Sequence, residues 1–200
     1  RINIAVFASG RGSNFAAIIQ AVKKGKLPIN LALLVSDNPG CFAVKRARKA
    51  KIKVALVVRG EFADKESFEE QIARRLKENN ISLIVLAGFM RMLSPEFVRR
   101  YKNKILNIHP ALLPGFKGAQ AIKDAFNYGV KTTGVTVHFV DELMDHGPII
   151  LQAPVKVESN DTLKSLEEKI HKIEHKLYPR AIKLFSKKLL KTRGRKVRII

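Results

Sequence analysis

Short runs of β-branched and apolar residues alternate with amphipathic stretches along the first half of the chain. Four runs have the length and composition of buried strands: residues 2–8, 31–36, 54–58 and 83–87. The stretches between them repeat apolar residues at helical spacing: residues 13–24, 42–50 and 65–79. This rhythm is typical of parallel strands joined by helical crossovers. It predicts an α/β fold with a doubly wound, Rossmann-like and mostly parallel sheet.

The second half of the chain continues with strand and helix signals. Ser94 is a capping residue, Pro95 fits a first helical turn and Glu96 complements the positive helix end, so a helix is expected from Ser94 to about Tyr101. We then expect a strand, a helix and a hairpin-like pair of strands, followed from Asn160 by one long C-terminal helix with apolar residues at three- and four-residue spacing. The ranges before that last helix are 104–108, 119–128, 133–141 and 148–157.

Composition sets broad bounds on the protein. With 200 residues and 46% hydrophobic content, one domain over residues 1–200 is expected. A single cysteine, Cys41, cannot form an internal disulfide and offers no metal-ligand spacing, so we expect a reducing, cytoplasmic location and no metal. The longest apolar stretch, about 81–92, is too short and too interrupted to span a membrane, and residues 1–7 have the pattern of a strand rather than of a secretory leader.

The formal net charge of +21 would attract phosphates, carboxylates or nucleic acid without distinguishing them. Basic residues are densest over residues 186–200, at the end of the chain. Such a stretch is more often a solvated tail than a binding element. We therefore expect a dispensable tail there and no nucleic-acid partner.

A glycine-containing segment, Ser9-Gly10-Arg11-Gly12-Ser13-Asn14, joins the first strand to the first helix. Backbone amides at such a helix start bind anions, and the glycines let a phosphate approach. Phe15 stands where a third glycine would complete a dinucleotide fingerprint, and no Gly-Lys-Ser/Thr follows, so neither NAD nor a P-loop is favoured. Asp37 lies in Ser36-Asp37-Asn38-Pro39-Gly40, where a turn aspartate is expected.

Asn107 and His109 are two residues apart at the end of a predicted strand, so their side chains lie on the same side. A carboxamide beside an imidazole can stabilise the oxyanion of an acyl transfer, although the same pair could merely shape the proline loop that follows. His138 has apolar strand neighbours and is expected to be structural. By position alone, Asp145 would be a solvated loop acid and Glu174 a salt-bridge partner on its helix.

Five segments together resemble the folate-dependent phosphoribosylglycinamide formyltransferases, and the similarity extends from Ile2 to about Phe185. One is the glycine segment, and the others are Leu86-Ala87-Gly88-Phe89-Met90-Arg91, Asn107-Ile108-His109-Pro110-Ala111-Leu112-Leu113-Pro114, His138-Phe139-Val140-Asp141-Glu142, and Asp145 followed by Gly147-Pro148-Ile149-Ile150. The resemblance implies the formyltransferase version of the fold. It also implies transfer of the formyl group of 10-formyltetrahydrofolate to the amine of glycinamide ribonucleotide.

The resemblance assigns roles to particular positions. It implies a catalytic trio of Asn107, His109 and Asp145, and ribonucleotide contacts from Gly12, Ser13, Asn14 and Glu174. The folate contacts that it implies are Lys65, Met90, Arg91, Met92, Leu93, Asn107, Val140, Asp141, Glu142, Leu143, Met144 and Asp145. Two positions depart from the family pattern. Gln120 stands where relatives commonly have histidine, and Lys65 stands where they often have an arginine, whose planar fork matches a carboxylate better.

Three alternatives are open on the sequence. A transfer-RNA formyltransferase would suit the basic charge but would need a C-terminal RNA-binding domain, and only a short stretch follows Phe185. A formyltetrahydrofolate hydrolase would use the same trio with water as the acceptor, but it usually carries an extra N-terminal domain. An RNA-binding protein on a formyltransferase scaffold would suit the basic charge, but the intact trio argues against it. We expect small-molecule substrates, no membrane partner, and a monomer or homodimer.

Overall fold

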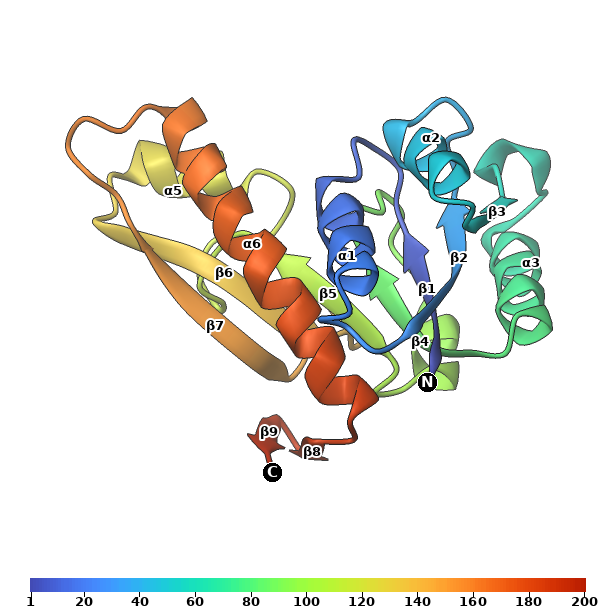
Figure 1. Ribbon diagram of the computed structural model, residues 1–200. Helices are drawn as coiled ribbons and strands as arrows, with labels where there is room; N and C mark the ends of the chain where they lie inside the picture. The colour runs from blue at the N-terminus through green and yellow to red at the C-terminus, as the bar shows by residue number, and fades with distance from the viewer. The chain divides into compact units, whose positions relative to one another are not determined.

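The computed structural model describes residues 1–200. The chain forms two compact units, Arg1–Leu106 and Asn107–Ile200, drawn in Figure 1 from blue to green and from green to red. The elements of the first unit are β1 (Asn3–Phe7), α1 (Ser13–Lys23), β2 (Asn30–Ser36), α2 (Phe42–Lys49), β3 (Lys53–Leu56), a 3₁₀ turn (Arg59–Glu61), α3 (Lys65–Glu78), β4 (Ile81–Leu86) and α4 (Pro95–Arg100). Strand β5 (Ile105–His109) begins in the first unit and ends in the second.

The first unit has the parallel sheet that the alternating pattern predicts. Its strands follow the order β3-β2-β1-β4, and all three pairings are parallel. Apolar side chains of the central strands, such as Ile4, Val6 and Val85, are fully buried. A strand buried on both faces has no need of polar alternation, which explains the continuous apolar runs in the sequence.

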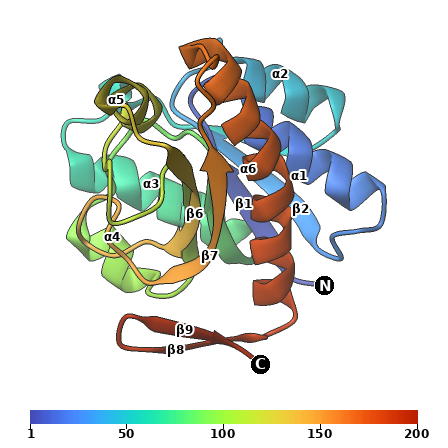
Figure 2. The same ribbon diagram turned by 90° about the vertical axis from the view of Figure 1, so that its left-hand side faces the viewer.

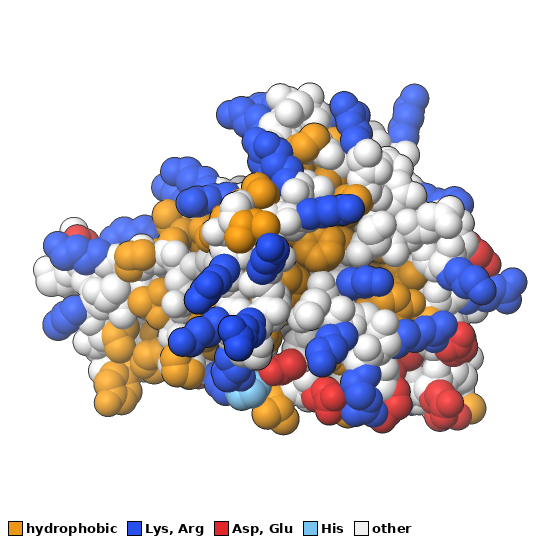
Figure 3. Space-filling view, turned by 90° about the horizontal axis from the view of Figure 1, so that it is seen from below, with side chains coloured by type: hydrophobic (Ala, Val, Ile, Leu, Met, Phe, Trp, Pro, Cys, Tyr) orange, Lys and Arg blue, Asp and Glu red, His pale blue; other side chains and the backbone are white.

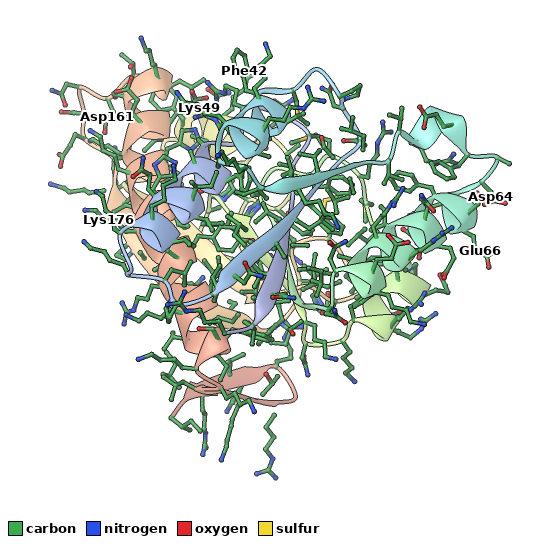
Figure 4. All side chains as sticks on the ribbon, turned by 45° about the vertical axis from the view of Figure 1, so that its right-hand side comes forward. Phe42, Lys49, Asp64, Glu66, Asp161 and Lys176 are labelled. Atoms are coloured by element: carbon green, nitrogen blue, oxygen red, sulfur yellow. The ribbon has the colours of Figure 1, made fainter.

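Side-chain caps fix where two helices of the first unit begin. Asp64, labelled in Figure 4, accepts a hydrogen bond of 2.7 Å from the backbone N–H of Ser67 at the start of α3. Ser94 caps α4 in the same way, accepting from the N–H of Phe97 at 3.1 Å, with Pro95 in the first turn. The helix predicted from Ser94 is therefore confirmed. Each cap satisfies an N–H that has no acceptor within the helix.

The second unit contains α5 (Ala121–Tyr128), β6 (Thr132–Phe139), β7 (Ile149–Lys156), α6 (Leu163–Ser186), β8 (Leu190–Arg193) and β9 (Lys196–Ile199). Strands β6 and β7 pair antiparallel, which confirms the predicted hairpin-like pair. Helix α6 is the predicted long helix. It lies over β6 and β7, as Figure 1 shows, and buries Leu166, Ile170 and Ile182 on its inner side.

The basic end of the chain differs from its prediction as a solvated tail. Residues 190–199 form an antiparallel hairpin of β8 and β9, seen beyond the end of α6 in Figure 2, and β9 pairs parallel to β7 through Lys196 and Ile149. Leu190, Thr192 and Val197 are partly buried between exposed basic residues, and Gly194 takes a φ of +57° at the turn. This period-two alternation with a turn glycine is a hairpin signal that the high charge obscured.

No helix in the structure has both the length and the apolar content needed to cross a membrane.

Candidate active site

The glycine segment forms a tight connection at the start of α1. Gly12 is the residue before the helix and has a φ of +66°, in the left-handed region. A Cβ at this position would lie 2.9 Å from the Cβ of Ala43 in α2, so both the backbone and the packing require glycine. The N–H of Ala43 donates to the carbonyl of Gly10 at 3.1 Å, which fixes the segment against α2. The first-turn amides of this eleven-residue helix lie at its positive end, where they have no acceptor within the helix.

Asp37 is more than the turn aspartate that the sequence predicts. It is 8% exposed, and its carboxylate accepts from the hydroxyl of Ser9 at 2.6 Å and from Nε of Arg91 at 2.7 Å. The Ser9 hydroxyl in turn accepts from the N–H of Met90 at 3.0 Å. Asn38, the next residue, makes the turn instead by accepting from the N–H of Gly40. Asp37 therefore links the glycine segment to the 88–93 loop, a role that only the burial of its carboxylate reveals.

Glu69 is a second buried acid that the sequence did not single out. It is 5% exposed in α3 and accepts from both the N–H and the hydroxyl of Ser94, the cap of α4, with the N–H at 2.7 Å. It thereby fixes the end of the 88–93 loop. Lys65 lines a cavity of about 410 Å³ together with Glu69 and Ser94, between α3 and α4. Lys65 thus shares this cavity with Ser94, which directly follows Leu93, the last of the predicted folate residues in the 88–93 loop.

In the second unit, the three residues that the family resemblance groups together lie close to one another: Asn107, His109 and Asp145. The Nδ2 of Asn107 donates to Oδ1 of Asp145 at 3.4 Å, and Nδ1 of His109 lies 3.4 Å from Oδ2. The N–H of Gly118 donates to the same Oδ2 at 2.9 Å. Asp145 itself has a φ of +47°, an unusual conformation for a residue with a side chain. The loop acid that looked solvated in the sequence is in fact partly buried, accepts from Asn107 and Gly118, and lies beside the ring of His109.

His109 is 3% exposed, and both of its ring nitrogens face acceptors. Its Nε2 donates to the carbonyl of Phe116 at 2.7 Å, while Nδ1 faces Asp145. A proton on either nitrogen therefore has a partner. Phe116 has a φ of +47° and packs its ring against Tyr128, so the proline loop after β5 is shaped around the histidine. The two interpretations of the Asn107 and His109 pair, as acyl-transfer groups and as loop supports, are thus compatible in this geometry.

His138 is the buried, hydrogen-bonded residue expected from its strand neighbours, but it also contacts the site. Its Nδ1 donates to the carbonyl of Phe139 at 2.8 Å, which leaves Nε2 to accept from Nδ2 of Asn107 at 3.3 Å. Burial lowers the pKa of His138 below its ordinary value of 6.5, although the Phe139 hydrogen bond and the charge of Asp145 act in the opposite direction. A neutral His138 thus fixes the orientation of the Asn107 amide.

The loop of residues 140–147 joins β6 to β7 and carries Asp145. Its base is closed where the N–H of Phe139 donates to the carbonyl of Pro148 at 2.9 Å, and a Cβ on Gly147 would overlap the carbonyl oxygen of Phe139. Within the loop, Leu143 and Met144 are 61% and 50% exposed. In the 88–93 loop of the first unit, Met90 and Met92 are 71% and 56% exposed. Both loops therefore offer apolar side chains that a ligand could cover.

Glu174 and Gln120 occupy contrasting positions. Glu174 is 4% exposed in α6, and its Oε2 lies 2.8 Å from Nδ1 of His171, one turn earlier. The salt-bridge role expected from the sequence therefore has a partner in the structure. Gln120 is exposed and precedes α5 without capping it through its side chain.

The chain is similar to known proteins in both sequence and structure. The family model described as "Formyl transferase" matches residues 2–182. A phosphoribosylglycinamide formyltransferase from Bacillus subtilis is 45% identical over 90% of this chain and 92% of its own. The crystal structure of glycinamide ribonucleotide transformylase 1 from Symbiobacterium toebii has a TM-score of 0.96 and 40% identity, covering 100% of this chain and 94% of that one. A formyltetrahydrofolate deformylase from Pseudomonas putida has a TM-score of 0.91 and 28% identity, covering 100% of this chain and 70% of that one.

The chain belongs to the formyl transferase family. Its α/β fold, with a mostly parallel sheet and a long C-terminal helix, is the fold of the matched structures, which confirms the fold predicted from the sequence.

Proposed function

We propose that this protein transfers the formyl group of 10-formyltetrahydrofolate to the amine of glycinamide ribonucleotide. The observation that carries this proposal is the grouping of Asn107, His109 and Gly118 around the carboxylate of Asp145. Acyl transfer needs donors for an oxyanion and an acceptor for the proton of the attacking amine. This cluster contains both, in a family whose near relatives are named for that reaction.

His109 and Asn107 are the proposed oxyanion donors. The amine nitrogen attacks the formyl carbon, and the formyl oxygen gains negative charge as the carbon becomes tetrahedral. In this proposal that oxygen replaces the Phe116 carbonyl as the acceptor of the Nε2–H of His109, which is now donated at 2.7 Å. The Asn107 amide makes contacts of 3.3 and 3.4 Å, at the long end of the hydrogen-bond range, so a charged oxygen competes well for them.

Asp145 is the proposed proton acceptor. Its carboxylate faces Nδ1 of His109 and can pair with that ring while the ring donates to the oxyanion. The amine loses its proton to this carboxylate through water. Collapse of the tetrahedral species breaks the bond from carbon to the folate nitrogen, which then takes up a proton and leaves as part of tetrahydrofolate. No covalent intermediate on the enzyme is required.

The remaining assignments are proposals for substrate binding. Gly12, Ser13 and Asn14 bind the ribonucleotide phosphate at the positive end of α1, whose geometry excludes a side chain at position 12. Glu174 binds the ribonucleotide. The folate contacts are Lys65, residues 90–93, Asn107 and residues 140–145, in which the exposed Met and Leu side chains supply apolar surface. We assign no metal to the reaction, because the cluster itself provides the proton acceptor and the oxyanion donors.

A single assay tests the proposed function against the hydrolase and RNA-binding alternatives. The protein is mixed with 10-formyltetrahydrofolate and either glycinamide ribonucleotide or buffer alone, and formation of tetrahydrofolate and of the formylated ribonucleotide is followed. We expect both products in equal amounts and only when the ribonucleotide is present. Equal release of tetrahydrofolate without the ribonucleotide would instead identify a hydrolase. No release in either mixture, together with tight binding of RNA, would support the RNA-binding alternative.

A further inference from the structure

The β8–β9 hairpin contacts the 140–147 loop through one residue. Arg195 lies in the hairpin turn, and its Nη2 donates to the backbone carbonyl of His146 at 2.5 Å. Its Nη1 lies 3.0 Å from Nε2 and 3.2 Å from Nδ1 of the same histidine. Both the backbone and the ring of His146 are therefore held by one guanidinium group, from a segment 49 residues later in the chain.

His146 is also held from within its own loop. Its Nδ1 lies 2.7 Å from Oδ2 of Asp141, and the other oxygen of Asp141 accepts from the N–H of Leu143 at 3.1 Å. A carboxylate can only accept, so Nδ1 carries the proton toward Asp141, and Nε2 is left as the acceptor for Nη1 of Arg195. The result is a chain of contacts from Asp141 through His146 to Arg195. It joins the second residue of the 140–147 loop to the second-to-last one.

We propose that Arg195 is a positioning residue that holds the 140–147 loop, and through it Asp145, in the geometry of the active site. Asp145 directly precedes His146, and its φ of +47° is unfavourable for a residue with a Cβ. Such a conformation persists when the surrounding structure fixes it. The Gly118 N–H fixes its carboxylate on one side, and the clamped His146 fixes the backbone on the other. The consequence for folate binding rests on the function proposed above.

The positive charge of the hairpin suggests a different role, in which the hairpin binds RNA and Arg195 does not act on the loop. Figure 3 shows Lys and Arg side chains gathered beside a histidine on the face seen from below. Four basic residues of the hairpin other than Arg195 are exposed and make no hydrogen bond or ion pair with the 140–147 loop: Lys191, Arg193, Lys196 and Arg198. However, the hairpin contains no aromatic side chain on which a base could stack. The geometry of Arg195 therefore favours a contact within the protein over one with RNA.

The test compares Arg195→Ala with Arg198→Ala, which removes the same charge from the same hairpin without touching the loop. Hydrogen exchange of the amides of residues 141–147 is measured first, because it does not depend on activity. We expect faster exchange by about two- to fivefold in Arg195→Ala, the scale of an exposed charged contact, and no change in Arg198→Ala. We expect a similar rise in the KM for 10-formyltetrahydrofolate, with the KM for glycinamide ribonucleotide unchanged.

His146→Ala completes the test. If Arg195 acts through His146, this variant shows the same rise in exchange and in folate KM, and the double variant is no worse than either single one. Unchanged exchange in Arg195→Ala would overturn the clamp, and faster exchange with unchanged folate KM would overturn its role in positioning. Equal effects of Arg195→Ala and Arg198→Ala would mean that the hairpin acts through its positive charge and not through the Arg195 contact. RNA binding that depends on both residues would lead to the same conclusion. A protein that forms no formylated ribonucleotide but shows the expected exchange would retain the clamp and reject the proposed function.

Discussion

The 88–93 loop of the first unit and the 140–147 loop of the second both expose large apolar side chains, but they are held in different ways. The first is anchored by two buried acids: Asp37 accepts from Arg91, and Glu69 accepts from Ser94 at the end of the loop. The second is fixed on one side by the partly buried Asp145 and on the other by the exposed Arg195. Removing one partner of a buried charged contact costs more than removing one partner of an exposed contact, because solvent cannot compensate the buried group that remains.

This difference separates two kinds of sensitivity. Loss of an acid that anchors the 88–93 loop should lower the stability of the whole protein, because it leaves the buried Ser9 hydroxyl or the partly buried Ser94 cap without its acceptor. Loss of the exposed clamp on the 140–147 loop should loosen that loop and leave global stability nearly unchanged. The 140–147 loop, which carries the proposed catalytic carboxylate, should therefore loosen more readily than the 88–93 loop. The predictions below test each part of this contrast.

The largest effect is expected at the inner side of the 140–147 loop, where Asp145 faces His109. Asp145→Asn keeps the size of the side chain but removes the charge that faces the imidazole and the acceptor for the amine proton. We expect kcat to fall about 100- to 1000-fold, and His109→Ala to cost a similar amount. The double variant should be little worse than the worse single one, because the two residues act as one unit.

The control for this comparison is Asp124→Asn, which removes an exposed carboxylate from the first turn of α5. It should leave kcat within about twofold of the native value, as is usual for surface changes. Losses that simply multiply in the double variant would show that Asp145 and His109 act independently. Thermal unfolding of all four variants separates loss of catalysis from loss of the fold.

The second effect concerns the buried anchor of the 88–93 loop. Asp37→Ala removes the acceptor for Ser9 and Arg91, and we expect unfolding to become easier by about 1–3 kcal/mol. In a protein of this size that corresponds to a fall in Tm of roughly 2–4 °C for each kcal/mol. Asp37→Asn keeps an acceptor for Ser9 and should lose less. If Asp37→Ala and Arg195→Ala lower Tm equally, the contrast between the two loops is wrong.

Much of the fold follows from the sequence, because periodicity reflects local geometry. The apolar run before the glycine segment, and the helix that Ser94 begins, both depend on residues within a few positions of each other. The hairpin at the end of the chain differs from its prediction for a related reason. Its alternation is present, but its high charge is more typical of a solvated tail, and its pairing with Ile149 depends on a residue far away in the sequence.

The site is less predictable, because it depends on burial. Asn107 and His109 could be paired from their spacing, but Asp145 could be joined to them only through resemblance to a family. Asp37 and Glu69 look like ordinary polar residues of a turn and a helix, and no local signal shows that their carboxylates are buried. Arg195 is one of many basic residues near the end of the chain, and only the fold distinguishes it from Arg198.

The smallest predicted effect is a pH dependence of stability from His138, whose ring orients Asn107. Burial lowers its folded pKa below 6.5, so the unfolded chain takes up a proton at a higher pH than the folded protein does. The contribution of His138 to stability is therefore complete at neutral pH and is lost as the pH falls through about 6.5, with a slope of at most about 1.4 kcal/mol per pH unit. Urea unfolding of the native protein and of His138→Gln between pH 5 and 8 measures the difference in slope, in which all other titrating groups cancel. We expect the native protein to lose stability more steeply below pH 6.5, whereas equal slopes would mean that His138 is protonated equally in both states and does not present a lone pair to Asn107.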